Sequence, residues 1–512
     1  MLENIGKLGG LFGQQRGPQH PLASAKELRR ILGELPMDNA LKALDEIVGW
    51  LQSVVAADGM GEDVLFEVTC QLDEAAQWHE LRLTREYLQS ARLSKTDEKR
   101  LWSAVHGFWL HAAACYEKCV ARLGAGDRPA ENLRAGLPLL ASRLIRALAM
   151  ALKWQRFRYD TPADTVWLRL ALAYSAAEQA GMATKAVQLY PKTSGMTSPQ
   201  QEYLKVLALQ ASAVDSLLPW EIELAWRLVA NYVGGFVFGP VSTAESVYWV
   251  DLARAQAPLR LASVPRQMVP TLRFFHPGRA YDNLQQLATE LERGAAVPTT
   301  LALGNQYSTR ALLPVLRHLA ACWAPVPPQR RHARHAVKHR MSVLVGFPDA
   351  LAACDGRPDP GRMESWVVEN VSRGGFGIVV GGEAEEQLPL GTLLAMQPEG
   401  GDNWLLGVVR RLRKGGDEAV HVGIQTLSRQ VAVVSLRPQA KGTSYAAAPG
   451  TAALWLQDVQ EEGEVTMLVP PGTFDLRTAM EFTDAGRVAV LYPAILAGEA
   501  GDHEVARFRR PG

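Results

Sequence analysis

The densest cluster of cationic side chains in the sequence lies between residues 329 and 340. This stretch reads QRRHARHAVKHR and has no carboxylate; its cations are Arg330, Arg331, Arg334, Lys338 and Arg340. The whole chain carries 54 Lys+Arg against 53 Asp+Glu, a formal net charge of +1, so the cluster is a local excess of positive charge. Arginine forks bind phosphate oxygens in pairs, so the stretch predicts an anion site. A solvated basic linker or a nonspecific nucleic-acid contact is the alternative interpretation.

A second polar motif follows about thirty residues further on. Residues 369–377 read ENVSRGGFG and lie between two short apolar runs, 365–368 and 376–380, that are typical of strands. Asn370 and Ser372 place an amide and a hydroxyl at the turn between these strands. Gly375 permits close approach of the backbone to a ligand. The motif therefore predicts a polar turn that can bind a small molecule.

The two motifs, in this order, resemble the PilZ domain family of bacterial cyclic di-GMP receptors. The family pattern is RxxxR before the first strand and [D/N]xSxxG later. Arg330 and Arg334 match the first motif, and Asn370, Ser372 and Gly375 match the second. Strand-like runs at 405–413 and 420–425 are also similar to strands of that small barrel. The resemblance covers residues 329–438.

The resemblance implies a ligand and a role for each residue. Arg330 and Arg334 would bind phosphate and guanine, with Arg331 assisting, because guanidinium groups pair with phosphate and stack on purines. Asn370 and Ser372 would contact guanine edges and sugar or phosphate oxygens. The expected ligand-binding set is completed by Gly374 and Gly375. Asn370 replaces the commoner Asp and removes a carboxylate that accepts guanine protons, which implies lower affinity.

No enzyme of this signalling system is predicted. Residues 415–419 read GGDEA and nearly match the GGDEF signature of diguanylate cyclases, but Ala419 replaces the final Phe. The segment lies between two expected strands, where a glycine turn is typical. No carboxylate set of the EAL type is visible, and the helical half lacks a nucleophile set or phosphate loop. We therefore expect no catalytic residues and no cofactor.

One helix carries a spacing that is compatible with metal binding. His111, Cys115 and Cys119 lie at i, i+4 and i+8 and would share a face, but no fourth ligand is evident. Free cysteine behaves as a small hydrophobe, so these residues are interpreted as core. No metal is expected.

The apolar spacing divides the chain into an α-helical part and a β-rich part. Residues 23–323 show three- and four-residue apolar spacing and predict an all-helical domain of hairpins. One unit resembles the tetratricopeptide signature, although an irregular helical domain is the alternative; its positions are Trp167, Leu170, Ala171, Tyr174, Ala183 and Val187. The remaining predicted segments are a tail at 1–22, a proline-rich joint at 324–329, a PilZ-like antiparallel β-barrel at 330–438 and a small β-rich region at 446–512.

Composition limits the class of protein. Hydrophobic residues make up 47% and charged residues 21% of the 512 positions, which excludes wholesale disorder. Five cysteines without a CxxC pair argue against a secreted disulfide framework and favour a reducing cytoplasm. The longest apolar run, 228–241, is shorter than a membrane span and contains Asn231. Residues 1–15 lack the pattern of a signal peptide.

These patterns together predict a cytoplasmic, non-enzymatic cyclic di-GMP receptor. Ligand capture by arginines beside the proline joint would reposition the helical domain and regulate an unidentified protein partner. DNA binding and a membrane span are not expected. The alternative is a degenerate PilZ barrel that binds no nucleotide and acts as a protein-interaction scaffold. Whether one or two dinucleotides bind is left open.

Overall fold

The computed structural model describes residues 20–89, 93–125, 134–191, 195–263, 265–326, 332–381, 388–415, 419–439, 450–459, 463–484 and 487–510. By their contacts, the residues divide into two compact units. The first unit comprises Met1–Arg158, Pro162–Val214 and Pro219–Pro328. The second comprises Gln329–Gly512 together with two short segments, Tyr159–Thr161 and Asp215–Leu218.

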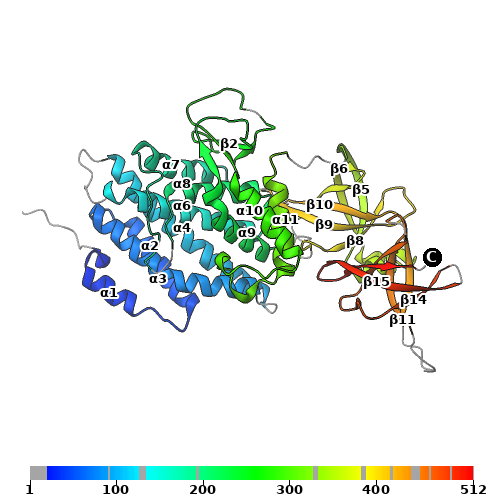
Figure 1. The fold of residues 1–512 in the computed structure, drawn as a ribbon. Coiled ribbons are helices and arrows are strands. Elements are labelled where there is room, and N and C mark those ends of the chain that lie inside the picture. The colour runs from blue at the N-terminus through cyan, green and yellow to red at the C-terminus, as the bar shows by residue number, and fades with distance from the viewer. Residues whose placement is uncertain are drawn as a thin grey trace, which may run out of the picture. The chain divides into compact units, whose positions relative to one another are not determined.

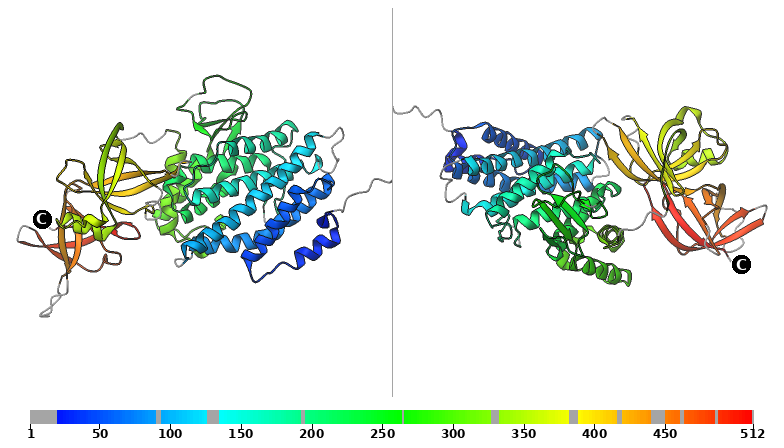
Figure 2. Two further views of the ribbon diagram at one scale, coloured as in Figure 1. Left: turned by 180° about the vertical axis from the view of Figure 1, so that it is seen from behind. Right: turned by 90° about the horizontal axis from the view of Figure 1, so that it is seen from above.

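Helices form most of the first unit, which confirms the predicted helical N-terminal half. The long helices lie side by side in Figures 1 and 2, coloured from blue to green along the chain. Their bounds are α1 (Ala25–Gly33), α2 (Ala40–Ala56), α3 (Glu62–Gln89), α4 (Lys95–Ala125), α6 (Leu137–Phe157), α7 (Thr165–Gln179), α8 (Pro199–Ala211), α9 (Pro219–Tyr232), α10 (Arg279–Glu292) and α11 (Thr309–Trp323).

Helix α6 is the centre of this unit. It packs against α4, α7, α8 and α9, and nearly all of its residues are buried. Two helices of the unit begin at side-chain caps that satisfy free amides: Asn39 accepts from Lys42 N at the start of α2, and Ser198 accepts from Gln201 N at the start of α8. Burial of the long apolar face of α6 therefore organises the unit.

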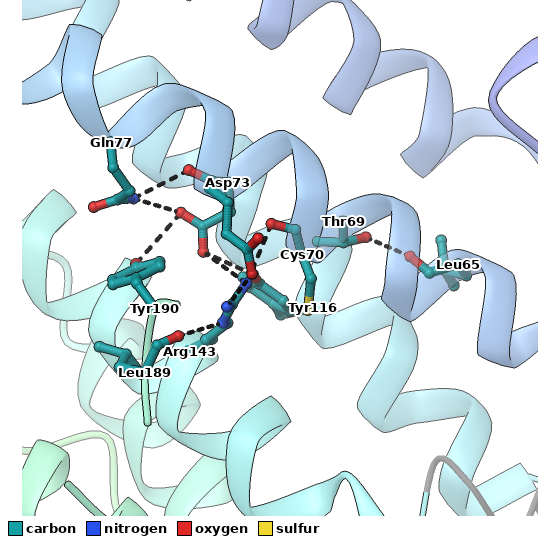
Figure 3. Close-up of polar contacts among 10 residues, drawn as sticks. Leu65, Thr69, Cys70, Asp73, Gln77, Tyr116, Arg143, Leu189 and Tyr190 are labelled. Atoms are coloured by element: carbon teal, nitrogen blue, oxygen red, sulfur yellow. Dashed lines mark hydrogen bonds and ion pairs between the residues drawn. The ribbon is translucent and has the colours of Figure 1, made fainter. Parts of the chain in front are cut away.

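A cluster of buried charge joins the helices (Figure 3). The Asp73 carboxylate on α3 accepts from Tyr116 Oη at 2.7 Å and from Gln77 Nε2 at 2.7 Å. Arg143 on α6 pairs with Glu74 at 2.5 Å and donates to the Leu189 carbonyl at 2.9 Å. Buried charges require such partners, so these contacts restrict how α3, α4 and α6 pack together.

The prediction of an all-helical domain over 23–323 misses a small sheet. Four strands pair in the order β1-β4-β2-β3; they are β1 (Val237–Gly239), β2 (Tyr248–Asp251), β3 (Leu259–Arg260) and β4 (Leu272–His276). Trp249, Leu272 and Phe274 form its buried core. These runs are short and rich in aromatic and β-branched residues, and they form strands by pairing with segments that are distant in the sequence. A search for helical spacing of apolar residues does not detect such pairing.

The tetratricopeptide-like unit ends after its first helix. Trp167, Leu170, Ala171 and Tyr174 are buried on α7, as the signature requires. Ala183 and Val187 lie instead in the loop before α8, where Val187 forms an isolated bridge with Thr197. Gly181 adopts a positive φ of 69° just after α7 and ends the helix, so no second helix follows at that spacing.

The second unit begins with a closed barrel of six antiparallel strands in the order β10-β7-β6-β5-β8-β9. Their bounds are β5 (His335–Val345), β6 (Glu364–Ser372), β7 (Gly375–Val380), β8 (Leu393–Pro398), β9 (Leu405–Lys414) and β10 (Val420–Ser428). Alternate residues point inward, among them Trp366, Ile378 and Val422, and fill the barrel. The predicted antiparallel barrel is thus confirmed.

The C-terminal region is a second closed barrel. Its strands run in the order β11-β12-β13-β16-β15-β14; they are β11 (Val431–Pro438), β12 (Thr451–Leu456), β13 (Glu464–Val469), β14 (Met480–Asp484), β15 (Arg487–Glu499) and β16 (Glu504–Arg509). The predicted bounds include β11 in the first barrel and begin the C-terminal region at 446. The structure instead pairs β11 with β12 and β14, because pairing across distant strands decides barrel membership.

The two barrels share an apolar cluster. Helix α12 (Phe347–Cys354) contributes Phe347, Ala350 and Ala353 to it. The first barrel adds Leu344 and Leu393, and the second adds residues of β12 and β13. This common core makes the C-terminal barrel an integral part of the second unit.

Candidate functional site

A two-residue turn, Arg373–Gly374, joins strands β6 and β7. Ser372 pairs with Gly375 across this turn, and the Ser372 hydroxyl donates to the Gly375 carbonyl at 3.3 Å. The carbonyl of Gly374 accepts from Thr426 N at 3.1 Å, which ties the turn to β10. A Cβ at Gly375 would overlap the carbonyl oxygen of Ile424, so only glycine fits there.

Asn370 lies two residue pairs further along the same hairpin. It pairs with Gly377, and its side chain covers this glycine so closely that a Cβ there would lie 2.8 Å from Oδ1. Within the described part of the chain, the buried Oδ1 of Asn370 has no hydrogen-bond partner. An unsatisfied buried acceptor costs about 1–3 kcal/mol. The position is thus costly for the free protein and suited to accept a ligand N–H.

These residues line one cavity of about 620 Å³. Of the predicted site residues, the structure gathers five around it: Arg334, Asn370, Ser372, Gly374 and Gly375. A volume of this size falls in the ordinary range of about 300–1,000 Å³ for small-molecule sites. Arg334 is exposed and immediately precedes β5. Arg330 and Arg331 lie outside the described residues.

The cavity also contains charged residues that the motifs did not indicate. On β9, Arg410, Arg411 and Arg413 line it, and Glu369 and His421 face it from β6 and β10. The alternation Arg411-Leu412-Arg413, with Leu412 buried, was the available signal. Sequence reasoning identified the strand but did not place its arginines opposite the turn, since the neighbour of β9 in the barrel is known only from the topology.

Four of these five charged groups have a side-chain partner in the second unit. Arg411 Nε lies 3.2 Å from Asp215 Oδ2, and Arg410 Nε donates to Gln425 Oε1 at 2.9 Å. His421 Nδ1 lies 3.4 Å from Glu369 Oε2. Four arginines against two carboxylates leave the cavity with a positive balance, which favours an anionic ligand.

A second, shallower hollow lies beyond Ser372. It has a volume of about 540 Å³ and is lined by His332, His335, Arg373 and Arg429 among others. The Arg429 guanidinium donates to the Arg373 carbonyl at 3.1 Å. Ser372 lines both hollows, so the turn between β6 and β7 separates them.

The cysteine-containing helix face in the first unit has the character of core. Cys115 and Cys119 are buried, and burial raises the pKa of each thiol to about 12. Cys115 Sγ donates to the Leu51 carbonyl at 3.4 Å, and His111 Nε2 lies 3.0 Å from Gln52 Nε2. Among the described residues, no cluster of three or more His, Cys, Asp or Glu is arranged to hold a metal ion.

Comparison with protein families gives two matches. Residues 359–432 match the middle PilZ domain of the cyclic-di-GMP receptor FimW. The first barrel is a PilZ domain. Residues 26–241 match the N-terminal domain of the same receptor. No curated protein matches the chain.

The PilZ match includes the polar turn but starts after the linker arginines. Asn370, Ser372, Gly374 and Gly375 lie inside the matched residues, whereas Arg330, Arg331 and Arg334 precede them. In the segment resembling GGDEF, residues 416–418 lie outside the described residues. The Gly415 amide donates to the Ala419 carbonyl at 2.8 Å, as expected for a turn that joins β9 to β10.

The helices of the described residues differ from membrane spans. None combines the length and the apolar character that crossing a bilayer requires.

Proposed function

We propose that this protein is a cyclic di-GMP receptor, in which ligand binding at the PilZ barrel and the linker arginines repositions the helical unit and regulates a protein partner. The observation that carries the proposal is the cavity that gathers Arg334, Asn370, Ser372 and Gly375 in a PilZ domain. The family description supports the ligand, since both matches are to domains of a cyclic-di-GMP receptor.

The polar turn supplies contacts for a guanine. The unpartnered Oδ1 of Asn370 is an acceptor for the N–H groups of a guanine edge. Ser372 has a hydroxyl that rotates and can contact a sugar or phosphate oxygen. Because the side chain of Asn370 rests against Gly377, a bound ring meets an oriented acceptor. Binding would remove the cost that the buried oxygen imposes on the free protein.

The arginines supply contacts for the phosphates. Arg334 at the start of β5 lines the cavity, and we propose that Arg330 and Arg331 approach the same ligand from the linker. Hydrogen bonds to charged groups contribute about 1.5–3 kcal/mol each, so three or more of them together reach the roughly 8 kcal/mol of micromolar affinity. Gly374 and Gly375 have no side chains and would leave room for the ligand beside the turn.

Covalent connectivity supports the repositioning step. The chain enters the second unit three times, at Tyr159–Thr161, at Asp215–Leu218 and at Gln329. The first two segments connect α6 to α7 and α8 to α9. A ligand that captures the linker before β5 would restrict the third connection, and its binding energy would favour one arrangement of the units.

In the proposed function, the protein acts by binding a ligand rather than by catalysis. A receptor for a second messenger needs no catalytic residues. We place it in the cytoplasm because its cysteines are free thiols, as a reducing compartment maintains them. The protein partner is unidentified, and neither DNA nor a membrane span is part of the proposal.

Calorimetric titration of the full chain with cyclic di-GMP tests the receptor function. We expect saturable binding that Arg334→Ala and Asn370→Ala each weaken and that Arg330→Ala weakens as well. Arg362→Ala is the matched control, because Arg362 is exposed on the same barrel and pairs with Asp349 away from the cavity. Absence of binding by two methods would favour the scaffold alternative.

Small-angle scattering tests the repositioning. We expect saturating cyclic di-GMP to change the scattering profile of the wild-type chain but not that of Arg330→Ala/Arg334→Ala. An unchanged profile at full occupancy would contradict the switching step while leaving the receptor function intact.

A further inference from the structure

Strand β9 presents three arginines on one side of the barrel. Along a regular strand, neighbours alternate between the inner and outer faces. Here Gly423 pairs with Arg411 and the next residue, Ile424, pairs with Val409, so Arg410 is the extra residue of a β-bulge. The bulge leaves both Arg410 and Arg411 exposed, while Leu412 points inward and Arg413 is exposed again. All three arginines therefore line the same cavity.

A single row of paired residues connects these arginines to the polar turn. Asn370 pairs with Gly377, Gly377 with Gly423, and Gly423 with Arg411, across β6, β7, β10 and β9. Adjacent strands are about 4.8 Å apart, so three steps separate the backbones of Asn370 and Arg411 by about 14 Å. The amide and the guanidinium thus stand at opposite ends of one row.

The two middle residues of this row are glycines. Gly377 and Gly423 carry no side chains of their own, and those of Asn370 and Arg411 lie against them from either end. A Cβ at Gly423 would lie 3.0 Å from the Cβ of Arg411, and one at Gly377 would overlap the amide of Asn370. Glycine at both positions therefore gives the side chains of Asn370 and Arg411 room to lie close to the sheet at the two ends of the row.

The present partner of Arg411 is an anion. The Asp215 carboxylate pairs with its guanidinium at 3.2 Å, and the Arg411 side chain is still half exposed. A phosphate oxygen is a chemical equivalent of this carboxylate and bonds the same planar fork. Arg413 is exposed two residues along, whereas Arg410 is held by Gln425.

We propose that Arg411 and Arg413 form a second anion subsite of the receptor, which binds the phosphate farther from the Asn370–Ser372 turn. Arg410 is a positioning residue: its bond to Gln425 maintains the bulge that turns Arg411 outward. The inference rests on the proposed function, since it assigns a further part of the same ligand to residues outside both sequence motifs.

The test is calorimetric titration of the full-length variants with cyclic di-GMP. Loss of one charge-assisted contact weakens binding by about 10- to 150-fold. We expect Arg411→Ala and Arg413→Ala each to fall in that range. Arg411→Lys should recover only part of the affinity, because lysine keeps the charge but lacks the fork. Asp215→Asn should tighten binding, since it removes the competing carboxylate.

Arg357→Ala is the matched control, because Arg357 is exposed in the same unit and pairs with Asp355. Thermal unfolding of each variant confirms that the barrel is folded. Wild-type affinity in Arg411→Ala and Arg413→Ala, with weakened binding in Arg334→Ala, would overturn the subsite and leave the receptor function intact. Failure of the wild-type chain to bind would overturn both.

Discussion

Gly377→Ala tests whether the orientation of Asn370 is what the PilZ barrel uses to bind its ligand. The added Cβ would lie 2.8 Å from both Cγ and Oδ1 of Asn370, closer than real Cβ contacts come. The obstructing atoms are the end of a short side chain, which can rotate away. The backbone therefore need not move, but Asn370 loses the position in which it faces the cavity.

The expected loss of affinity in Gly377→Ala follows from the contacts that Asn370 would make with the ligand. One or two hydrogen bonds to a guanine edge contribute about 0.5–1.5 kcal/mol each. Their loss weakens binding by up to about 150-fold and at least by about 2-fold. The free energy of unfolding should change by less than about 1 kcal/mol, because no backbone contact is broken.

The assay is a double-mutant cycle read by calorimetric titration with cyclic di-GMP. Asn370→Ala, Gly377→Ala and the double variant should lose the same affinity, since each removes one and the same interaction. Gly381→Ala on the same barrel is the control, because nothing lies within 4 Å of an added Cβ there. Additive losses, or wild-type affinity in Gly377→Ala, would refute the reasoning.

Three further predictions concern stability. Gly375→Ala should destabilise the barrel in urea unfolding by about 1–3 kcal/mol, because the new Cβ overlaps the Ile424 carbonyl; unchanged stability would contradict the close approach. Arg143→Met should cost about 3–5 kcal/mol by the same assay, since it leaves the buried Asp73 without its compensating cation; a smaller loss than Lys42→Met on the surface would count against this. Burial lowers the pKa of His106 to about 4, so its contribution to stability is lost as pH falls from about 6.5 to 4, where only the unfolded chain binds the proton. His106→Leu should flatten that pH dependence, and an unaltered profile would exclude His106 as its source.

Several features follow from local sequence alone. The segment 40–56 has apolar residues at helical spacing and a capping Asn39, and it forms α2 over those same residues. The run ENVSRGG between two alternating segments forms a two-residue turn between β6 and β7. These interactions lie within one helix or one hairpin, so spacing and residue type suffice to predict them.

Other features depend on contacts between residues distant in the chain. β11 follows directly on β10 but pairs with β12 and β14, and only that pairing places it in the second barrel. Val187 carries a tetratricopeptide position but bridges to Thr197 in a loop. The local residue pattern of β11 is compatible with either barrel, and that of Val187 with a helix or a loop. Local propensity therefore does not decide either case.

The candidate site likewise combines features set by local sequence with features set by long-range contacts. The sequence by itself predicts the residues of the candidate anion site: arginines before β5, and Asn370 and Ser372 on a glycine turn. The tertiary structure alone decided what faces them. Barrel closure places β9 two strands from β7, and a bulge against β10 turns Arg410 and Arg411 to the same side. Strand order and bulges arise from long-range hydrogen bonding, which no residue pattern within a single strand records.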